Sequence, residues 1–93
     1  MLYLVLMSHD VRDFATWKAA FDEFPPRQGG AVLHIVCRKL HDRNHVTVLA
    51  GFETADAARA YVTLPALKEA MARGGVIGHP RVELLEQVEA IEY

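Results

Sequence analysis

Residues 2–9 of the chain read LYLVLMSH, a short apolar run rich in leucine and valine. A continuous run of this length is typical of a central strand that is covered on both faces of its sheet. Its side chains alternate between two equally apolar sets: Leu2, Leu4 and Leu6, and Tyr3, Val5 and Met7. Because neither set suits water, we expect both faces of the sheet to be covered.

An apolar helix pattern follows this strand. Asp13 is placed to cap a helix, and the aromatic residues Phe14, Trp17, Phe21 and Phe24 follow at helical spacing. The stripe ends at two prolines, which cannot continue a helix. This pattern predicts a helix whose aromatic side lies on the sheet.

Residues 31–40 and 45–53 are rich in β-forming side chains and predict a hairpin. The purely apolar sides of both strands are expected to share the helix-covered face, and this condition selects the register. A two-residue turn at Arg43-Asn44 satisfies it and pairs Arg38 with Leu49.

The second half of the chain predicts more helix and one more strand. Thr54 is a plausible cap for a helix that runs through Val62, and Pro65 is placed to begin a further helical segment over 65–73. Glycines at 74 and 75 end that segment, and residues 74–80 are interpreted as a loop. The last strand is expected over residues 81–91.

The elements predict one α+β domain spanning residues 1–93, a ferredoxin-like βαββαβ two-layer sandwich. Right-handed crossovers place the strands of its antiparallel sheet in the order 4-1-3-2, with the helices on one face. Leaving a few hundred Å² of apolar strand surface in water forgoes several kcal/mol, at roughly 25 cal/mol per Å². We therefore expect a homodimer that pairs through the open face, and we expect Val5→Asp to disrupt it.

Composition limits the classes of partner. The 93 residues carry a net charge of −2, and the ten lysines and arginines are scattered, so neither nucleic acid nor a membrane is an expected partner. Cys37 is the only cysteine, which excludes an internal disulfide, and we interpret it as an inert buried thiol. The apolar first residues lack a basic leader and are too short to span a bilayer, so we expect a cytoplasmic protein.

Several motifs of the chain resemble a known family. They are Val11-Arg12-Asp13-Phe14, Trp17-Lys18, Phe21-Asp22, Ala58-Arg59-Ala60-Tyr61, Pro65-Ala66-Leu67-Lys68-Glu69-Ala70-Met71 and Gly75-Val76-Ile77-Gly78. Together they resemble the small bacterial dimeric α/β-barrel proteins related to antibiotic biosynthesis monooxygenases. The resemblance implies two ferredoxin-like subunits that pack sheet against sheet.

The same resemblance implies a range of activities, because the superfamily includes cofactor-free monooxygenases, haem-degrading enzymes, polyketide cyclases and isomerases. No catalytic residue is carried over, and no cofactor is expected. The functional hypothesis is a protein that binds a small organic ligand, as a cofactor-independent monooxygenase or a cyclase-like enzyme. The alternative is a non-catalytic homodimeric regulatory or stress-related protein.

Two groups of residues are candidates for ligand binding. His34 and Arg38 are expected on the dimer-facing side together with His9, where a histidine would serve as acid or base and Arg38 would hold a carboxylate. The alternative is an interface network in which His34 pairs with Glu53 across the hairpin.

The second group is Trp17 and Tyr61, because the resemblance implies ligands bound between the helices and the sheet. The alternative role of Trp17 is that of a core anchor within its aromatic stripe.

Histidine spacing also raises the question of a metal site. His41 and His45 have the spacing of two ligands on a helix, but here they flank a hairpin turn. His9 and His45 form a better pair, yet no third ligand has a firm spacing. We therefore expect no metal site.

Overall fold

The structure is a computed structural model that describes residues 1–93. Its elements in chain order are β1 (Tyr3–Val11), α1 (Phe14–Glu23), the short 3-10 helix η1 (Pro26–Gly29), β2 (Leu33–Lys39), β3 (Asp42–Phe52), α2 (Ala55–Val62), α3 (Pro65–Arg73) and β4 (Val76–Glu86). None of these helices is both long and apolar enough to cross a membrane.

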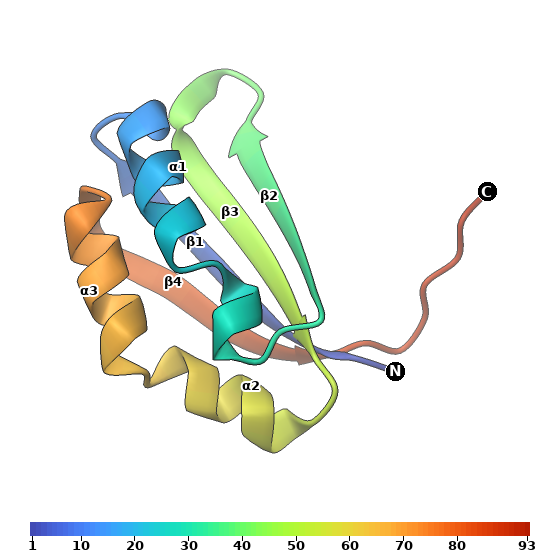
Figure 1. The fold of residues 1–93 in the computed structure, drawn as a ribbon. Helices are drawn as coiled ribbons and strands as arrows, with labels where there is room; N and C mark the ends of the chain where they lie inside the picture. The colour runs from blue at the N-terminus through green and yellow to red at the C-terminus, as the bar shows by residue number, and fades with distance from the viewer.

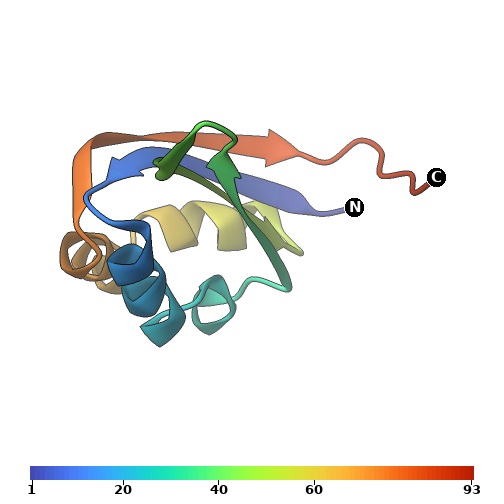
Figure 2. The same cartoon turned by 90° about the horizontal axis from the view of Figure 1, so that it is seen from above.

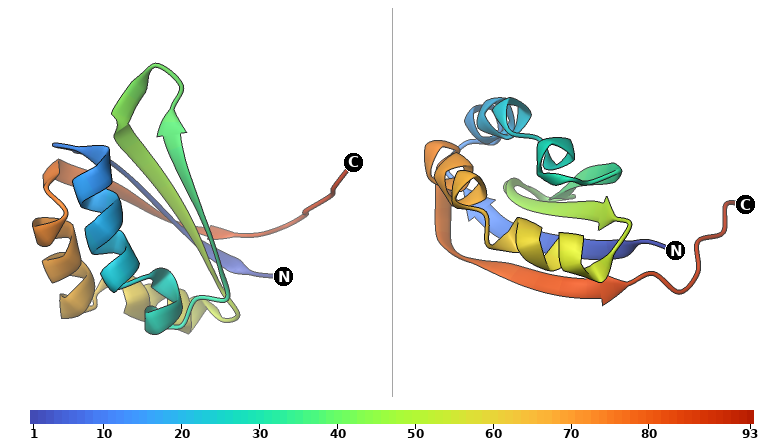
Figure 3. Two further views of the ribbon diagram at one scale, coloured as in Figure 1. Left: turned by 45° about the horizontal axis from the view of Figure 1, so that its top comes forward. Right: turned by 60° about the horizontal axis from the view of Figure 1, so that its bottom comes forward.

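The four strands form one antiparallel sheet in the order β2-β3-β1-β4, which confirms the predicted 4-1-3-2 topology and the ferredoxin-like α+β class. The helices all lie on one side of the sheet (Figure 1), and Figure 2 shows the other side free of any element. The views in Figure 3 show the same two layers, with the last residues of the chain leading away from the sheet.

Local signals place the helix boundaries as expected. The Asp13 carboxylate accepts a hydrogen bond from the backbone N–H of Thr16 at 2.9 Å, and this bond lowers the pKa of Asp13. The Thr54 hydroxyl accepts from the backbone N–H of Ala57 at 3.1 Å and caps α2 in the same way. Pro65 stands in the first turn of α3.

The last strand begins and ends earlier than predicted, because β4 starts at Val76, includes Gly78 and Pro80, and ends at Glu86 rather than at Ile91. Both residues discourage strands, but β4 is an edge strand and its register with β1 shifts between Ser8 and Asp10. An edge strand with a bulge tolerates a missing N–H and a glycine. The loop predicted for residues 74–80 is therefore mostly strand.

The predicted hairpin register is wrong. The turn lies at Leu40-His41, and Arg38 pairs with Val46 rather than with Leu49. Asn44, expected in the turn, instead uses its side-chain oxygen to accept from the backbone N–H of Phe14 at 3.0 Å, at the start of α1. The shift is an odd number of residues, so every side chain of β2 changes face.

This shift moves two candidate site residues. His34 and Arg38 pair with Ala50 and Val46, which are buried beneath the helices, so both lie on the helix-covered face and not on the dimer-facing side as predicted. The reason is that β2 is an edge strand, where long polar side chains cover the rim of α1 and still reach water. His9 is also on the helix-covered face, where it is 4% exposed.

The open face therefore carries the apolar side chains of β2. Leu33 and Ile35 are 44% and 47% exposed there, and Leu85 of β4 is 39% exposed. Cys37 is exposed on this face, so its interpretation as a buried thiol is wrong.

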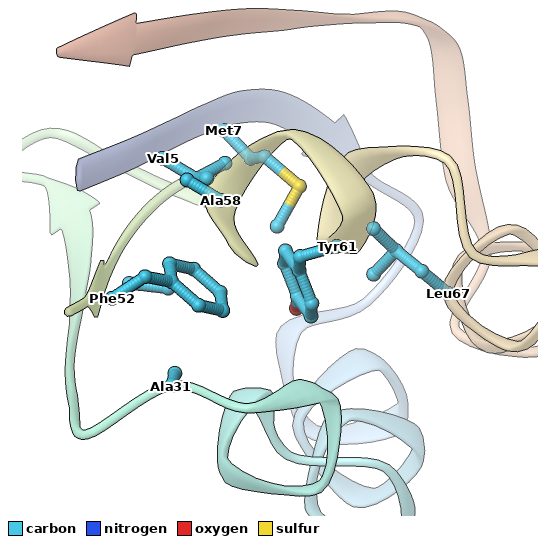
Figure 4. Close-up of a cluster of buried hydrophobic side chains, with 8 residues drawn as sticks. Val5, Met7, Ala31, Phe52, Ala58, Tyr61 and Leu67 are labelled. Carbon is cyan, nitrogen blue, oxygen red and sulfur yellow. The ribbon is translucent and has the colours of Figure 1, made fainter. Parts of the chain in front are cut away.

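The core beneath the helices divides into two clusters. The larger contains Val5, Met7, Ala31, Ala50, Phe52, Ala58, Tyr61 and Leu67, and the smaller contains Val11, Trp17, Val46 and Val48. Figure 4 shows the Tyr61 ring in the middle of the larger cluster, between Phe52 and Leu67. The chain passes close to this ring at Gly29, where an added Cβ would lie 2.5 Å from Cδ1 of Tyr61.

Candidate functional site

A pocket lies between α1, α3 and the sheet, where the two core clusters meet. The space in it that a water molecule can enter is about 20 Å³, so any ligand larger than water has to displace lining side chains. Its lining is apolar except for one histidine and comprises Met7, His9, Trp17, Phe21, Phe24, Val48, Tyr61, Leu67, Ala70 and Met71. The half-buried members Phe21, Phe24 and Met71 mark the side that opens to water. Helices α1 and α3 run next to each other over this part of the sheet (Figure 1).

His9 is the polar group of the pocket. It follows Val5 and Met7 on the helix-covered face of β1, because every second residue of a strand shares a face. Its ring meets the Trp17 ring edge-on, with 5.8 Å between centroids. The ring atom Nδ1 is buried and has no hydrogen-bond partner. An unpaired polar atom in an apolar pocket is costly, and a bound molecule that pairs with it would recover that cost.

Burial also fixes the charge of His9. Removal of the ring from water lowers its pKa below the ordinary value of 6.5, and the charge of His45 on the next strand lowers it further. The Asp10 carboxylate acts in the opposite direction but does not reverse the shift. His9 is therefore a neutral imidazole at pH 7 and can accept a proton.

Aromatic rings form the wall next to His9. Trp17 is 4% exposed and packs against Phe14 and Phe21, with ring centroids 5.8 Å and 5.0 Å away. An added Cβ at Gly74 would lie 3.0 Å from Cδ1 of Trp17, so the chain after α3 packs closely on the indole. This wall is a closely packed aromatic surface that borders the pocket.

Tyr61 also lines the pocket. Its ring lies 5.1 Å from that of Phe52, and burial raises the pKa of its hydroxyl to about 12. The phenol is therefore protonated at neutral pH and can act only as a hydrogen-bond donor or acceptor, never as an anion.

The structure brings together three of the five candidate residues, His9, Trp17 and Tyr61. The other two lie outside the pocket at the rim of α1. The His34 ring meets Phe21 edge-on at 5.2 Å, and the guanidinium carbon of Arg38 lies 4.3 Å from the ring centre of Phe14. Both side chains cover the outer surface of the aromatic stripe.

Sequence reasoning missed the contribution of α3 to the pocket. Leu67, Ala70 and Met71 line it from that helix. Their spacing of three and four residues is the signal that would have placed them on one helix face.

The buried neutral state of His9 predicts a dependence of stability on pH. The unfolded chain binds a proton at His9 below about pH 6.5, whereas the folded protein resists protonation to lower pH. Between these two pKa values the unfolded state holds more protons, so the free energy of unfolding falls as pH falls. The limiting slope is about 1.4 kcal/mol per pH unit for one group.

Urea unfolding of the wild type and of His9→Phe between pH 7.5 and 4.5 measures this contribution. Phenylalanine keeps an aromatic ring against Trp17 but cannot titrate, so the difference in unfolding free energy between the two proteins should shift in favour of the variant as pH falls. A pH-independent difference would show that His9 is not held neutral by the fold.

Comparison with known proteins gives similarity in structure only. No protein-family model matches the sequence, and no curated protein matches it significantly. Among solved structures, SnoaB, a cofactor-independent oxygenase from Streptomyces nogalater, superimposes with a TM-score of 0.78 and 18% identity over 99% of this chain and 98% of its own.

Two further structures are candidate antibiotic biosynthesis monooxygenases. The protein from Bordetella bronchiseptica has a TM-score of 0.76 and 17% identity over 95% of this chain and 98% of its own. The protein from Caulobacter crescentus has a TM-score of 0.74 and 21% identity over 95% of this chain and 91% of its own. The fold expected from the sequence motifs is thus confirmed: this chain has the ferredoxin-like fold of the antibiotic biosynthesis monooxygenase structures.

Proposed function

We propose that the pocket beside His9 binds a small aromatic molecule and that the protein is an enzyme that removes a proton from it. The observation that carries this proposal is the His9 imidazole, which is neutral, buried and unpartnered at Nδ1 in an otherwise apolar pocket. A neutral imidazole within reach of a bound substrate is the usual general base of enzymes near pH 7.

The substrate class follows from the surroundings of that base. Trp17, Phe21 and Tyr61 line the pocket, so a bound ring would lie among aromatic side chains, and the protonated Tyr61 hydroxyl is able to donate a hydrogen bond. A molecule with an acidic C–H or O–H next to such a ring system can place its proton on His9. Its anion would then be spread over the aromatic system inside an apolar site.

Such an anion has two productive fates. In the monooxygenase reaction it reduces O₂ directly, so that a CH₂ group becomes a carbonyl, with one oxygen atom in the product and the other in water. In a cyclase-like reaction the carbanion attacks a carbonyl of the same molecule. The structural similarity to SnoaB, a cofactor-independent oxygenase, supports the first of these.

We also propose that the protein acts as a homodimer in which two open faces meet. The support is the set of apolar side chains that the fold leaves uncovered on this face, namely Leu4, Leu6, Leu33, Ile35, Leu49 and Leu85. Burial of a few hundred Å² of them contributes several kcal/mol, at roughly 25 cal/mol per Å². Figure 2 shows that no element of the chain itself approaches this face.

A panel of phenols, hydroquinones, quinones and small carboxylic acids tests the enzyme proposal. A ligand that binds the native state stabilises it by mass action, by about 2.7 kcal/mol at a hundredfold excess over its Kd. This stabilisation raises the melting temperature. We expect aromatic members of the panel to raise it, and electron-rich ones to cause oxygen uptake measured with an electrode. Small aliphatic acids should do neither.

Three variants locate the activity. His9→Phe keeps the volume of the side chain but removes the base, and we expect oxygen uptake to fall by about 100-fold or more while the thermal shift persists. His34→Gln alters a histidine outside the pocket and should leave both signals unchanged. Trp17→Phe should weaken the thermal shift. If no aromatic ligand shifts the melting temperature, or if His9→Phe retains full uptake, the enzyme proposal is wrong and the non-catalytic dimer is favoured.

A further inference from the structure

The helices leave a strip of the helix-covered face bare along the edge strand β4. Val82 is the cross-strand partner of the buried Met7 and shares its face, because partners in a sheet point to the same side. Val82 is nevertheless 45% exposed, and Leu84, the partner of the fully buried Val5, is 48% exposed. The helices therefore do not cover the apolar side chains of this edge.

A hollow between α3 and β4 occupies part of this strip. Water can enter about 200 Å³ of it, against about 20 Å³ of the pocket beside His9. Its lining includes the apolar residues Met7, Leu67, Met71, Pro80 and Val82. The hollow lies on the helix-covered face, so a partner subunit that covers the open face leaves it accessible.

Three side chains lie between the hollow and the pocket. Met7, Leu67 and Met71 line both spaces. Met7 and Leu67 belong to the larger core cluster and are 3% and 8% exposed, whereas Met71 is half-buried at the margin of that cluster. The unbranched side chain of methionine has three rotatable bonds and adapts easily to its surroundings. A change of the Met71 rotamer is therefore the least costly way to join the two spaces.

Lys68 is the charged group of the hollow. Its side chain is exposed and takes part in none of the ion pairs of the structure. The pocket on the other side of Met71 contains His9, whose Nδ1 is buried and unpaired. The joined space thus offers two polar groups, an ammonium near water and a neutral imidazole in the core, with apolar side chains between them.

We propose that the hollow is the second half of the ligand site and that the ligand is an aromatic carboxylic acid. Its ring system displaces the side chain of Met71 and enters the pocket beside His9, while its carboxylate stays in the hollow on Lys68. This inference rests on the proposed function, because it names the substrate class of the same pocket. It also explains how a ring enters a pocket whose free space, about 20 Å³, holds about one water molecule.

The charge of the hollow selects the acidic group. One ammonium balances the single charge of a carboxylate, whereas a phosphate with nearly two negative charges would leave charge unpaired beside apolar side chains. The exposure of Lys68 keeps this end of the ligand in contact with water, so the carboxylate is not stripped of its hydration. The apolar ring system, in contrast, gains from leaving water for the pocket.

Two matched probes test the role of Lys68: 2-naphthoic acid and its uncharged amide, 2-naphthamide. Calorimetric titration at pH 7.5 should show the carboxylate bound about fivefold more tightly than the amide, the effect of one exposed ion pair. Lys68→Gln should remove this preference and leave the affinity for the amide unchanged. Lys18→Gln, on α1 and outside the hollow, is the matched control and should keep the preference.

Stopped-flow measurement of the association rate tests the role of Met71. Trp17 is the only tryptophan and lines the pocket, so its fluorescence reports entry of the probe. Met71→Ala removes the movable side chain and should speed association of 2-naphthamide by about tenfold, because no rotamer change then precedes binding. Met71→Leu keeps the volume but has a branched, stiffer side chain, and should slow association. Circular dichroism establishes that each variant is folded.

The outcomes separate this inference from the proposed function. Equal affinity of the wild type for the two naphthyl probes, or a preference that survives Lys68→Gln, shows that the hollow does not hold a carboxylate, while the aromatic pocket stands. Association rates that are the same in the wild type and Met71→Leu overturn the role of Met71. If the wild type binds neither probe, both the aromatic pocket and its extension into the hollow are wrong.

Discussion

Val5→Asp is expected to prevent folding of the chain, whereas Leu6→Asp, at the next position of β1, is expected to leave the subunit folded. Val5 is 0% exposed in the larger core cluster, between Ala50 and Leu84 on the neighbouring strands. An unpaired carboxylate at such a site costs several kcal/mol, a large share of the roughly 5–15 kcal/mol that stabilises a small domain. Leu6 is only half-buried and points to the open face, where the aspartate of the variant reaches water.

The expectation that Val5→Asp disrupts the dimer is wrong, because Val5 lies on the helix-covered face. Leu6→Asp is the variant that tests the dimer. Circular dichroism and urea unfolding should report a folded Leu6→Asp and an unfolded Val5→Asp. Sedimentation velocity should then show Leu6→Asp as a monomer beside a dimeric wild type. A folded, dimeric Leu6→Asp would count against pairing through the open face, and a stable Val5→Asp would contradict the assigned faces of β1.

Trp17→Ala is expected to lower the free energy of unfolding by about 3–5 kcal/mol. The indole is 4% exposed and packs against His9, Phe14, Phe21 and the chain at Gly74. These contacts come from β1, α1 and the segment after α3, so the cavity cannot close by movement of one element. The loss therefore combines lost burial with a persistent void.

Far-UV circular dichroism is the appropriate measurement, because Trp17 is the only tryptophan and its fluorescence disappears with the substitution. Lys18→Ala is the control on the same helix. Its ammonium pairs with Asp22 at 2.6 Å on the surface, and such pairs contribute about 1 kcal/mol or less. A loss for Trp17→Ala no larger than that of the control would show that the aromatic wall is not a structural anchor.

The sequence by itself determined the elements whose signals are local. Asp13 and Thr54 carry side-chain oxygens that satisfy free backbone N–H groups at the first turns of α1 and α2. Pro65 fixes the start of α3 in the same local manner. Because these interactions involve residues three or fewer positions apart, no knowledge of the rest of the fold is needed to infer them.

The topology and the apolar pocket wall were also determined in this way. Two apolar sets alternate along β1, and the aromatic stripe of α1 has the period of a helix, so the layers and the strand order follow from general rules. The position of Trp17 on the sheet side of α1 is part of the same pattern. Tyr61 was predicted near it only through the family resemblance.

Tertiary structure alone decided the faces of β2 and the start of β4. Edge strands are only partly covered, so burial does not select one register for β2, and Asn44 is used at the start of α1 rather than in the turn. The bulge opposite His9 likewise allows Pro80 to stand within β4. These choices depend on contacts between segments far apart in the chain.

The same reason explains why the candidate site could not be assembled from the sequence. His9 and Ser8 are neighbours in the chain, yet the alternation of β1 sends one into the aromatic pocket and the other to the open face. Which of the two faces the helices cover decides that His9 becomes neutral and buried while Ser8 meets His45. That decision is made by the packing of the whole core, since burial is a property of the assembled layers and not of any single segment.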